Sequence, residues 1–214
     1  GWKYTTGTGS GYSYNFTIDY NLIYGGVIPG DQIEYFIVAQ DNSPNHLTGA
    51  SSGIFPTPLT STLLNINNFP VENVKHSYFI SIPFAGIVEV GQGKPFTSLT
   101  NSDGLFAALN NGILVGNLQV RITSNLSESG VVPLKKITCE NNNPYTISIY
   151  PTGNYTISGT APTSMITFDG TERVTIDGRI NRTGSTNALT IQNNQTSATV
   201  IRMMNSVKNI TIRN

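Results

Sequence analysis

The stretch that decides the fold is Val174-Thr175-Ile176-Asp177-Gly178, a short strand followed by a residue that permits a tight turn. Its pattern, apolar-Thr-Ile-polar, occurs five times in the second half of the chain, at residues 145–148, 155–158, 174–177, 189–192 and 210–213. Gly or Asn follows four of the five copies. β-branched and aromatic residues favour strands, and Gly and Asn favour turns. Recurrent short strands joined by turns predict a coiled, repetitive β structure.

The spacing of the later copies defines the repeat. Ile166 has a counterpart 35 residues later at Ile201, and Val174 has one 36 residues later at Ile210. One repeat then holds three strands, at about residues 166–170, 174–178 and 188–193. Such repeats stack as a solenoid whose successive turns pair in parallel about 4.8 Å apart. We expect these apolar side chains to point into the coil: Val174, Ile176, Leu189, Ile191, Ile210 and Ile212.

A helix is expected over residues 103–111, ahead of the repeats. Ser102 or Asp103 suits its N-cap, and Gly112 suits its end. Leu105, Phe106 and Leu109 share one face of this helix. The end of a solenoid exposes unpaired backbone and apolar core, so we expect the helix to cap the N-terminal end. The two Tyr-Thr-Ile-Ser copies are expected in an irregular first turn beneath this cap.

The N-terminal residues predict a different β structure. Apolar and polar residues alternate strictly from Tyr12 to Tyr20, and residues 33–39 form a more continuous apolar run. An immunoglobulin-like sandwich needs about seven strands, so residues 1–55 are interpreted as the C-terminal portion of such a sandwich. Residues 56–77, interrupted by prolines, are interpreted as a linker, and residues 78–214 as the capped coil. Most of five tyrosines are expected in the sandwich core, with stacking on sugars as the alternative: Tyr12, Tyr14, Tyr20, Tyr24 and Tyr35.

Composition excludes several function classes. The chain has 214 residues with 12 basic and 12 acidic side chains, so it lacks the positive charge of a nucleic-acid binder. Charged residues make up only 11% of the chain, a low share that is typical of many extracellular β proteins. One cysteine, Cys139, permits no intrachain disulfide. No apolar run is long enough for a transmembrane helix, and no cofactor motif is recognised, so neither membrane insertion nor a cofactor is expected.

One cluster of ionisable residues is a candidate site. Within eleven residues lie three carboxylates and two arginines: Asp169, Glu172, Arg173, Asp177 and Arg179. The functional reading is a glycan or Ca²⁺ site. The alternative, which we favour, is turn chemistry at Asp169-Gly170 and Asp177-Gly178. No other repeat supplies a matching carboxylate, and a glycosidase needs a pair of carboxylates across its substrate.

Two stretches carry a resemblance to a known class of protein. Residues 14–20 and 30–41, the latter containing Tyr35-Phe36-Ile37-Val38-Ala39-Gln40-Asp41, resemble the Ig- or fibronectin-like modules of large secreted bacterial surface proteins. Residues 88–214 resemble the right-handed parallel β-helix modules of the same adhesin-like proteins, through Val90-Gly91-Gln92-Gly93, Val174–Gly178 and Asn209–Asn214. The resemblance implies an all-β chain with a right-handed coil, secreted and associated with the cell surface.

These observations favour a non-enzymatic segment of a secreted or cell-surface bacterial protein that serves in adhesion or as a structural stalk. The expected partners are surface glycans or a host or neighbouring cell surface. A partial sandwich at one end and a bare strand at the other lead us to expect further domains of the same polypeptide on both sides. The alternative is a carbohydrate-binding or polysaccharide-cleaving β-helix protein whose active turns lie outside this chain.

Overall fold

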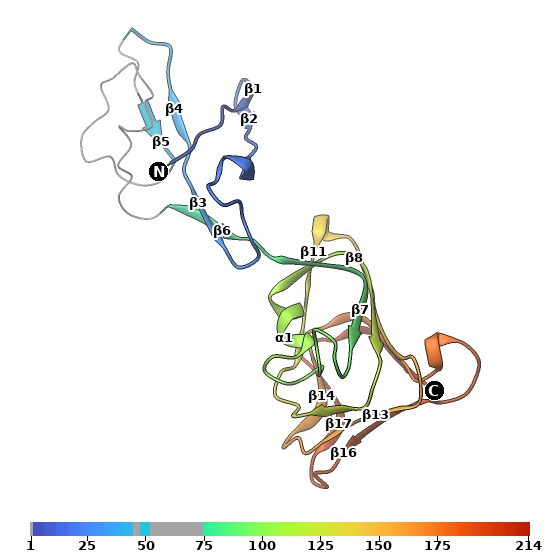
Figure 1. Cartoon of the computed structure of the whole chain (residues 1–214). Helices are drawn as coiled ribbons and strands as arrows, with labels where there is room; N and C mark the ends of the chain where they lie inside the picture. The colour runs from blue at the N-terminus through green and yellow to red at the C-terminus, as the bar shows by residue number, and fades with distance from the viewer. Residues whose placement is uncertain (1, 45–47, 52–74) are drawn as a thin grey trace. The chain divides into compact units, whose positions relative to one another are not determined.

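A computed structural model describes residues 2–44, 48–51 and 75–214. The chain divides into two compact units, residues 1–80 and 81–214. The second unit contains the predicted coil and is the better packed of the two (Figure 1). No helix among the described residues is long and apolar enough to cross a membrane.

The second unit is built from three parallel sheets. The long sheet stacks β7 (Ile82–Val90), β8 (Gly112–Ile122), β12 (Ile147–Pro151), β15 (Glu172–Asp177) and β18 (Lys208–Arg213), with short β11 (Thr138–Cys139) beside β8. The second sheet stacks β9 (Leu126–Glu128), β13 (Tyr155–Gly159) and β16 (Leu189–Asn193). The third sheet stacks β10 (Leu134–Lys135), β14 (Ser164–Asp169) and β17 (Thr199–Met204). The chain visits the three sheets in turn, so it forms a parallel β-solenoid of about four turns.

The predicted register of the coil is confirmed. Ile166 pairs with Ile201, and Val174 pairs with Ile210, as the spacing required. Of the six side chains expected to point inward, Val174, Ile176 and Leu189 are buried, and Ile191 and Ile210 are half-buried against the core. The sixth, Ile212, is 48% exposed because β18 is the last strand of its sheet.

The two Tyr-Thr-Ile-Ser copies do not form an irregular first turn, and that prediction is wrong. Tyr155–Gly159 pairs residue for residue with Leu189–Asn193. The copy at residues 145–148 enters the long sheet instead. Its pattern is offset by two residues from that of β15, so that Ile147 rather than Tyr145 lies opposite Val174. Turn length explains the error, because successive turns of the long sheet are 29 residues (118 to 147), 27 residues (147 to 174) and 36 residues (174 to 210) apart.

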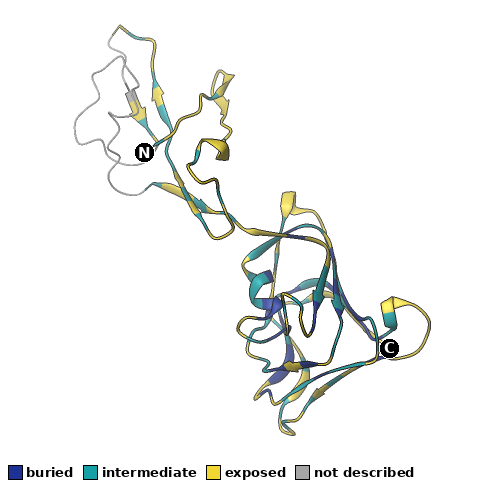
Figure 2. Cartoon of the chain, viewed as in Figure 1, coloured by how far each residue is buried: buried dark blue, intermediate teal, exposed yellow. Residues whose placement is uncertain are grey.

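The core runs along the inside of the coil. Alternate residues along the strands point inward, and the buried apolar side chains of all three sheets join in one cluster. Figure 2 shows the buried positions in dark blue on the ribbon of this unit. Its largest fully buried members include Phe106, Phe168, Leu118, Ile149 and Ile157. Full burial of such a side chain contributes about 1.5–3 kcal/mol, so this cluster dominates the stability of the coil.

The predicted helix is present but shorter. Helix α1 (Leu105–Asn110) places Leu105, Phe106 and Leu109 in the core cluster, each with no exposed surface. The predicted N-cap is wrong, because Gly104 occupies that position without a side-chain bond. The helix ends at Asn110 with Asn111 as its C-cap, and Gly112 instead begins β8, where a Cβ atom would lie 2.5 Å from the ring of Phe84.

The first unit contains only small antiparallel sheets. These pair β1 (Thr8–Ser10) with β2 (Ser13–Asn15), β3 (Gln32–Tyr35) with β6 (His76–Phe79), and β4 (Val38–Gln40) with β5 (Thr48–Ala50). The short 3₁₀ helix η1 (Tyr20–Leu22) follows β2. The expected strand over residues 12–20 shrinks to β2, and the expected strand over residues 33–39 divides between β3 and β4. An immunoglobulin-like sandwich is therefore not confirmed.

The tyrosines of the first unit do not form a core. Tyr12 and Tyr24 are fully exposed, Tyr14 and Tyr20 are largely exposed, and Tyr35 is half-buried. The predicted linker over residues 56–77 lies outside the described residues up to residue 74, and its last two residues begin β6.

Candidate functional site

The coil aligns one ladder of polar side chains on the outer face of the long sheet. Register places Glu89 of β7 opposite Arg121 of β8, Arg121 opposite Tyr150 of β12, and Asp177 of β15 opposite Arg213 of β18. Tyr150 lies opposite Asp177, because the preceding residues of their strands are paired. The first four of these residues each have a strand neighbour in the core cluster, so by alternation their side chains point outward, and Arg213 follows from its pairing with Asp177. We call Glu89, Arg121, Tyr150, Asp177 and Arg213 the outer column.

Tyr150 is the centre of the outer column and is 2% exposed despite its outward position. Its hydroxyl donates to Gln119 Oε1 at 2.6 Å and accepts from Arg121 Nε at 3.1 Å. The guanidinium of Arg182 lies over its ring, 4.9 Å from the ring centroid, in cation–π contact. Arg182 belongs to the short 3₁₀ helix η4 (Ile180–Arg182) in the loop after β15, and its Nη2 also donates to Gln119 Oε1 at 3.3 Å. This loop therefore folds back over the sheet and covers the tyrosine.

Asp177 has no exposed surface and binds two arginines at once. Arg179 donates to it from its backbone N, its Nε and its Nη2, at 3.1, 2.9 and 2.8 Å. Arg213 of the next turn places its Nε and Nη2 2.9 and 2.7 Å from the same carboxylate. These donors occupy both carboxylate oxygens. Asp177 thus joins two turns of the coil, and it has no oxygen left for a metal ion or a substrate.

Both carboxylates of the outer column are held in their charged form. Hydrogen bonds from Arg179 and Arg213 outweigh burial and hold the pKa of Asp177 well below its usual range. Asp177 in turn raises the pKa of Arg179. The Lys94 ammonium, 2.6 Å from Glu89, lowers the pKa of that carboxyl, with a smaller contribution from Arg121. Neither of these two carboxyl groups is therefore placed to exchange protons near neutral pH.

The structure does not bring the five predicted site residues into one site. Asp169 ends β14 and accepts from Asn205 Nδ2 at 2.5 Å. Glu172 binds Lys136 at 3.0 Å and Arg173 at 2.7 Å. Only Asp177 and Arg179 belong to the outer face of the long sheet. The five residues thus divide among separate sets of contacts, and the described residues contain no group of three or more metal-binding side chains.

The turn interpretation holds for one of the two Asp-Gly pairs. Gly170 has a φ of +65° and follows Asp169 at a bend, as turn chemistry requires. Gly178 has no positive φ and continues the backbone pairing, with its N–H donating to Arg213 O at 2.9 Å. It is required for space instead, because a Cβ atom there would lie 2.0 Å from Asn214 O.

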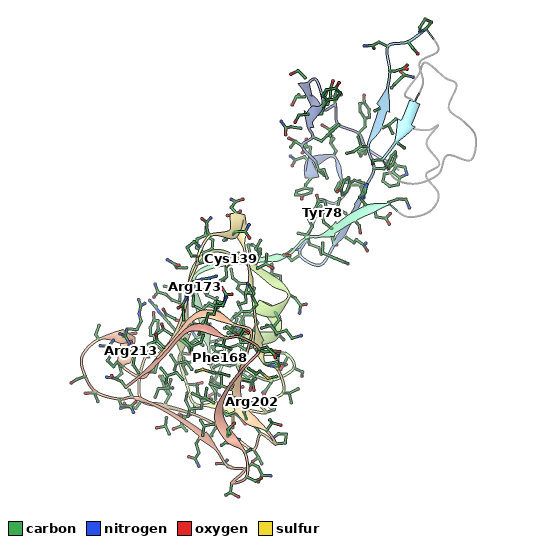
Figure 3. All side chains as sticks on the ribbon, turned by 180° about the vertical axis from the view of Figure 1, so that it is seen from behind. Tyr78, Cys139, Phe168, Arg173, Arg202 and Arg213 are labelled. Carbon is green, nitrogen blue, oxygen red and sulfur yellow. The ribbon has the colours of Figure 1, made fainter. Side chains whose placement is uncertain are left out.

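Arg173 contacts residues of the preceding turns of the coil. Its backbone has a φ of +58°, and its Nε donates to Tyr145 O at 3.0 Å. Its Nη2 lies 3.9 Å from the sulfur of Cys139, next to which Figure 3 labels it. Arg173 and Glu172 thus link β15 to residues of the preceding turns, and Glu172 has its pKa lowered by Lys136 and Arg173.

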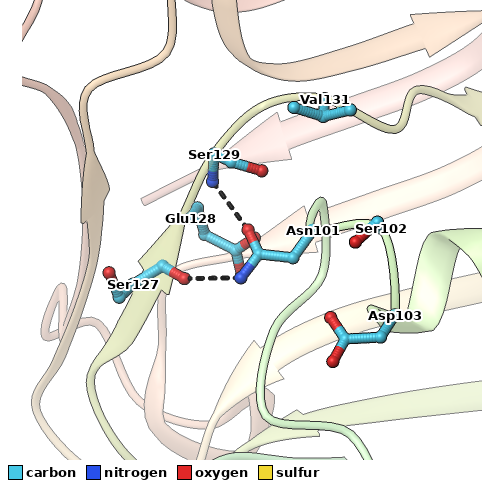
Figure 4. Close-up of a pocket in the computed structure, with 7 residues that line it drawn as sticks. All are labelled: Asn101, Ser102, Asp103, Ser127, Glu128, Ser129 and Val131. Carbon is cyan, nitrogen blue, oxygen red and sulfur yellow. Dashed lines mark hydrogen bonds between the residues drawn. The ribbon is translucent and has the colours of Figure 1, made fainter.

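A separate pocket lies beside the start of α1 (Figure 4). It is lined by Asn101, Ser102, Asp103, Ser127, Glu128, Ser129 and Val131. Asn101 accepts from Ser129 N at 2.8 Å and donates to Ser127 O at 3.2 Å. Glu128 is 4% exposed and accepts from Leu99 N, Thr100 N and Thr100 Oγ1, each at 2.6 Å.

The Glu128 carboxylate is a structural tie. Burial raises its pKa, while the three donors oppose that rise. All three donors belong to the segment that leads into α1, so the carboxylate holds that segment against β9. We assign the pocket no ligand.

Sequence reasoning missed most of the outer column. Arg121, Tyr150 and Arg213 come from turns of unequal length, so no fixed spacing connects them. Arg182 lies in a loop whose path over the sheet has no sequence signal. The one available signal was the alternation in residues 118–122, which predicts an outward Arg121.

Comparisons of the chain with protein-family models, with curated proteins and with solved structures give no significant match.

Proposed function

We propose that this chain is a non-enzymatic segment of a secreted or cell-surface bacterial protein, where it serves in adhesion or as a structural stalk. The observation that carries this proposal is the state of Asp177. The one carboxylate from the candidate cluster that reaches the outer face is buried and bound by two arginines. A group in this state stabilises the stack of turns and is not free to act as a general acid, base or nucleophile.

The proposal includes finer points of architecture. The coil is right-handed, as β-strand crossovers nearly always are. Helix α1 caps its N-terminal end, which is supported by the three side chains that α1 buries in the core cluster. Residues 1–55 belong to an Ig- or fibronectin-like module, supported by their resemblance to such modules.

The expected setting is extracellular and associated with the cell surface, with surface glycans or a neighbouring cell as partner. The low share of charged residues supports this setting. A second candidate is a polysaccharide-binding or polysaccharide-cleaving β-helix protein with active turns outside residues 1–214. On the outer face of the long sheet, arginine and lysine side chains outnumber the carboxylates of Glu89 and Asp177, which favours an acidic polysaccharide for that candidate.

The test uses the parent protein and the 214-residue chain side by side. Both are incubated with acidic and neutral polysaccharides, and the mixtures are analysed for unsaturated or newly reducing sugar products. Adhesion of cells that carry or lack the parent protein is measured in parallel. The proposal predicts loss of adhesion without the protein and no cleavage products. Cleavage that disappears on replacing a carboxylate or an arginine would overturn it in favour of the second candidate.

A further inference from the structure

The outer face of the long sheet has a net positive charge, although the net charge of the whole chain is zero. Five cations lie in or beside the outer column: Lys94, Arg121, Arg179, Arg182 and Arg213. Two carboxylates, Glu89 and Asp177, lie among them, so this face has a net charge of +3 (five minus two), whereas the 214-residue chain has a net charge of zero. A local excess of this kind attracts an anionic partner.

Several donors on this face have no acceptor in the described part of the chain. Arg121 uses only its Nε, toward Tyr150, and both Nη groups remain unused. Arg213 binds Asp177 through Nε and Nη2, its Nη1 is unused, and its side chain is half-exposed. Arg182 is exposed and uses Nη2 alone. Three guanidinium groups from three different segments therefore offer donors to solvent on one face.

These guanidinium groups are held in place before any partner arrives. Tyr150 fixes Arg121 by a hydrogen bond and Arg182 by its ring, and Asp177 fixes Arg213. A pre-ordered side chain loses less conformational entropy on binding than a free one. The planar guanidinium fork also matches flat anionic groups such as carboxylates, through paired hydrogen bonds.

We infer that the outer column, together with Arg182, binds an acidic glycan that lies across the strands of the long sheet. From Arg121 to Arg213 the column spans three strand spacings, or about 14 Å, which is long enough for several sugar units. Recognition is ionic, because Arg182 already covers the ring of Tyr150 and leaves no aromatic face for a neutral sugar. A duplex nucleic acid is disfavoured, because it needs a broad basic footprint that a chain of zero net charge lacks.

This inference names the partner class for the proposed adhesive function and rests on that function. The test measures binding of the 214-residue chain to dextran sulfate, polygalacturonate, neutral dextran and duplex DNA. The test variant is the double substitution Arg121→Gln with Arg182→Gln, and Arg182→Gln alone serves as a milder change in a surface loop. The matched control is Arg202→Gln, an exposed arginine on the third sheet, labelled apart from Arg213 in Figure 3.

We expect binding to at least one of the two acidic glycans and not to neutral dextran, with the salt dependence of an ionic contact. The double variant should bind roughly tenfold or more weakly, because it removes two cationic groups that would make charge-assisted hydrogen bonds to the glycan. Arg182→Gln should show part of that loss and Arg202→Gln none. The two polyanions separate a sulfate from a carboxylate preference.

Several results would overturn the inference: no binding to either acidic glycan, equal loss in the Arg202→Gln control, or equally tight binding of duplex DNA. Unchanged melting profiles of all variants establish that they fold. Appearance of cleavage products would instead refute the non-enzymatic function, while leaving the binding face intact. If the chain neither binds nor cleaves an acidic glycan, the inference fails, but the proposed structural role of the coil is unaffected.

Discussion

Replacing Asp177 with Ala removes the carboxylate that joins the fourth and fifth strands of the long sheet. Removing one partner of a buried ion pair costs about 3–5 kcal/mol, because the other charge is left without compensation. In this variant water can solvate the Arg213 guanidinium, because its side chain is 50% exposed, and this reduces the loss of stability. The Arg179 side chain is only 20% exposed, so water compensates its charge less. We therefore expect a loss of about 3 kcal/mol in the free energy of unfolding, at the lower end of that range.

The assay is urea unfolding of the 214-residue chain, followed by circular dichroism. For a chain of this size the same loss lowers the melting temperature by about 6–12 °C. The matched control is Asp169→Ala, which removes a carboxylate with a single side-chain bond, to Asn205 at the surface. We expect this control to lose less than about 1 kcal/mol. Equal losses in the two variants would refute the assignment of Asp177 as the tie between turns.

The same pair of proteins gives a pH test with a defined sign. The arginines lower the pKa of Asp177 below its ordinary value of 3.8, so the carboxylate stabilises the folded chain fully above that pH. The contribution is lost as pH falls through the lower, folded-state pKa. The stability difference between the native chain and Asp177→Ala should therefore be constant from about pH 7 to pH 5 and shrink below about pH 4. A difference that grows on acidification would contradict this sign.

Five further substitutions test the packing. Ile176→Asp buries an unpaired charge and should prevent folding, while Thr175→Ser on the outer face should be tolerated. Equal melting temperatures of the two variants would refute the assignment of Ile176 to the core and Thr175 to the outer face. Glu128→Ala leaves the Leu99 and Thr100 amides without their acceptor and should cost about 2–4 kcal/mol in urea unfolding. In Gly159→Ala a Cβ atom would lie 1.8 Å from Glu128 O, so we expect a large loss of stability, whereas Gly49→Ala meets no atom within 4 Å and should have almost no effect.

Much of the coil could be predicted from residues alone. Alternation and turn residues predict short strands, and the match of Val174-Thr175-Ile176 with Ile210-Thr211-Ile212 predicts both parallel pairing and its register. The helix face of Leu105, Phe106 and Leu109 was predicted correctly for the same reason: burial imposes a periodic pattern on the sequence.

The outer column could not be predicted, because its members meet only through pairing between turns of different length. A loop that adds nine residues between two turns leaves the register intact but removes the fixed spacing that a repeat search needs. The extent of the strands and of the core in the first unit was overestimated for a different reason. Alternation from Tyr12 to Tyr20 is a local pattern, and in the described residues of that unit it meets no second sheet to bury its aromatic face.

The register of the turns is the central claim, since it alone builds the outer column. It is tested by disulfide formation on the outer face, in a chain with Cys139→Ser. Ser148 pairs with Thr175, and Thr175 pairs with Thr211, so either pair replaced by cysteines lies about 4.8 Å apart at Cα, within disulfide reach. The pair at 148 and 211 lies two strands apart, at roughly 9.6 Å, beyond that reach. We predict rapid bonds in the first two variants and none in the third; a bond between 148 and 211, or none between 175 and 211, would contradict the structure.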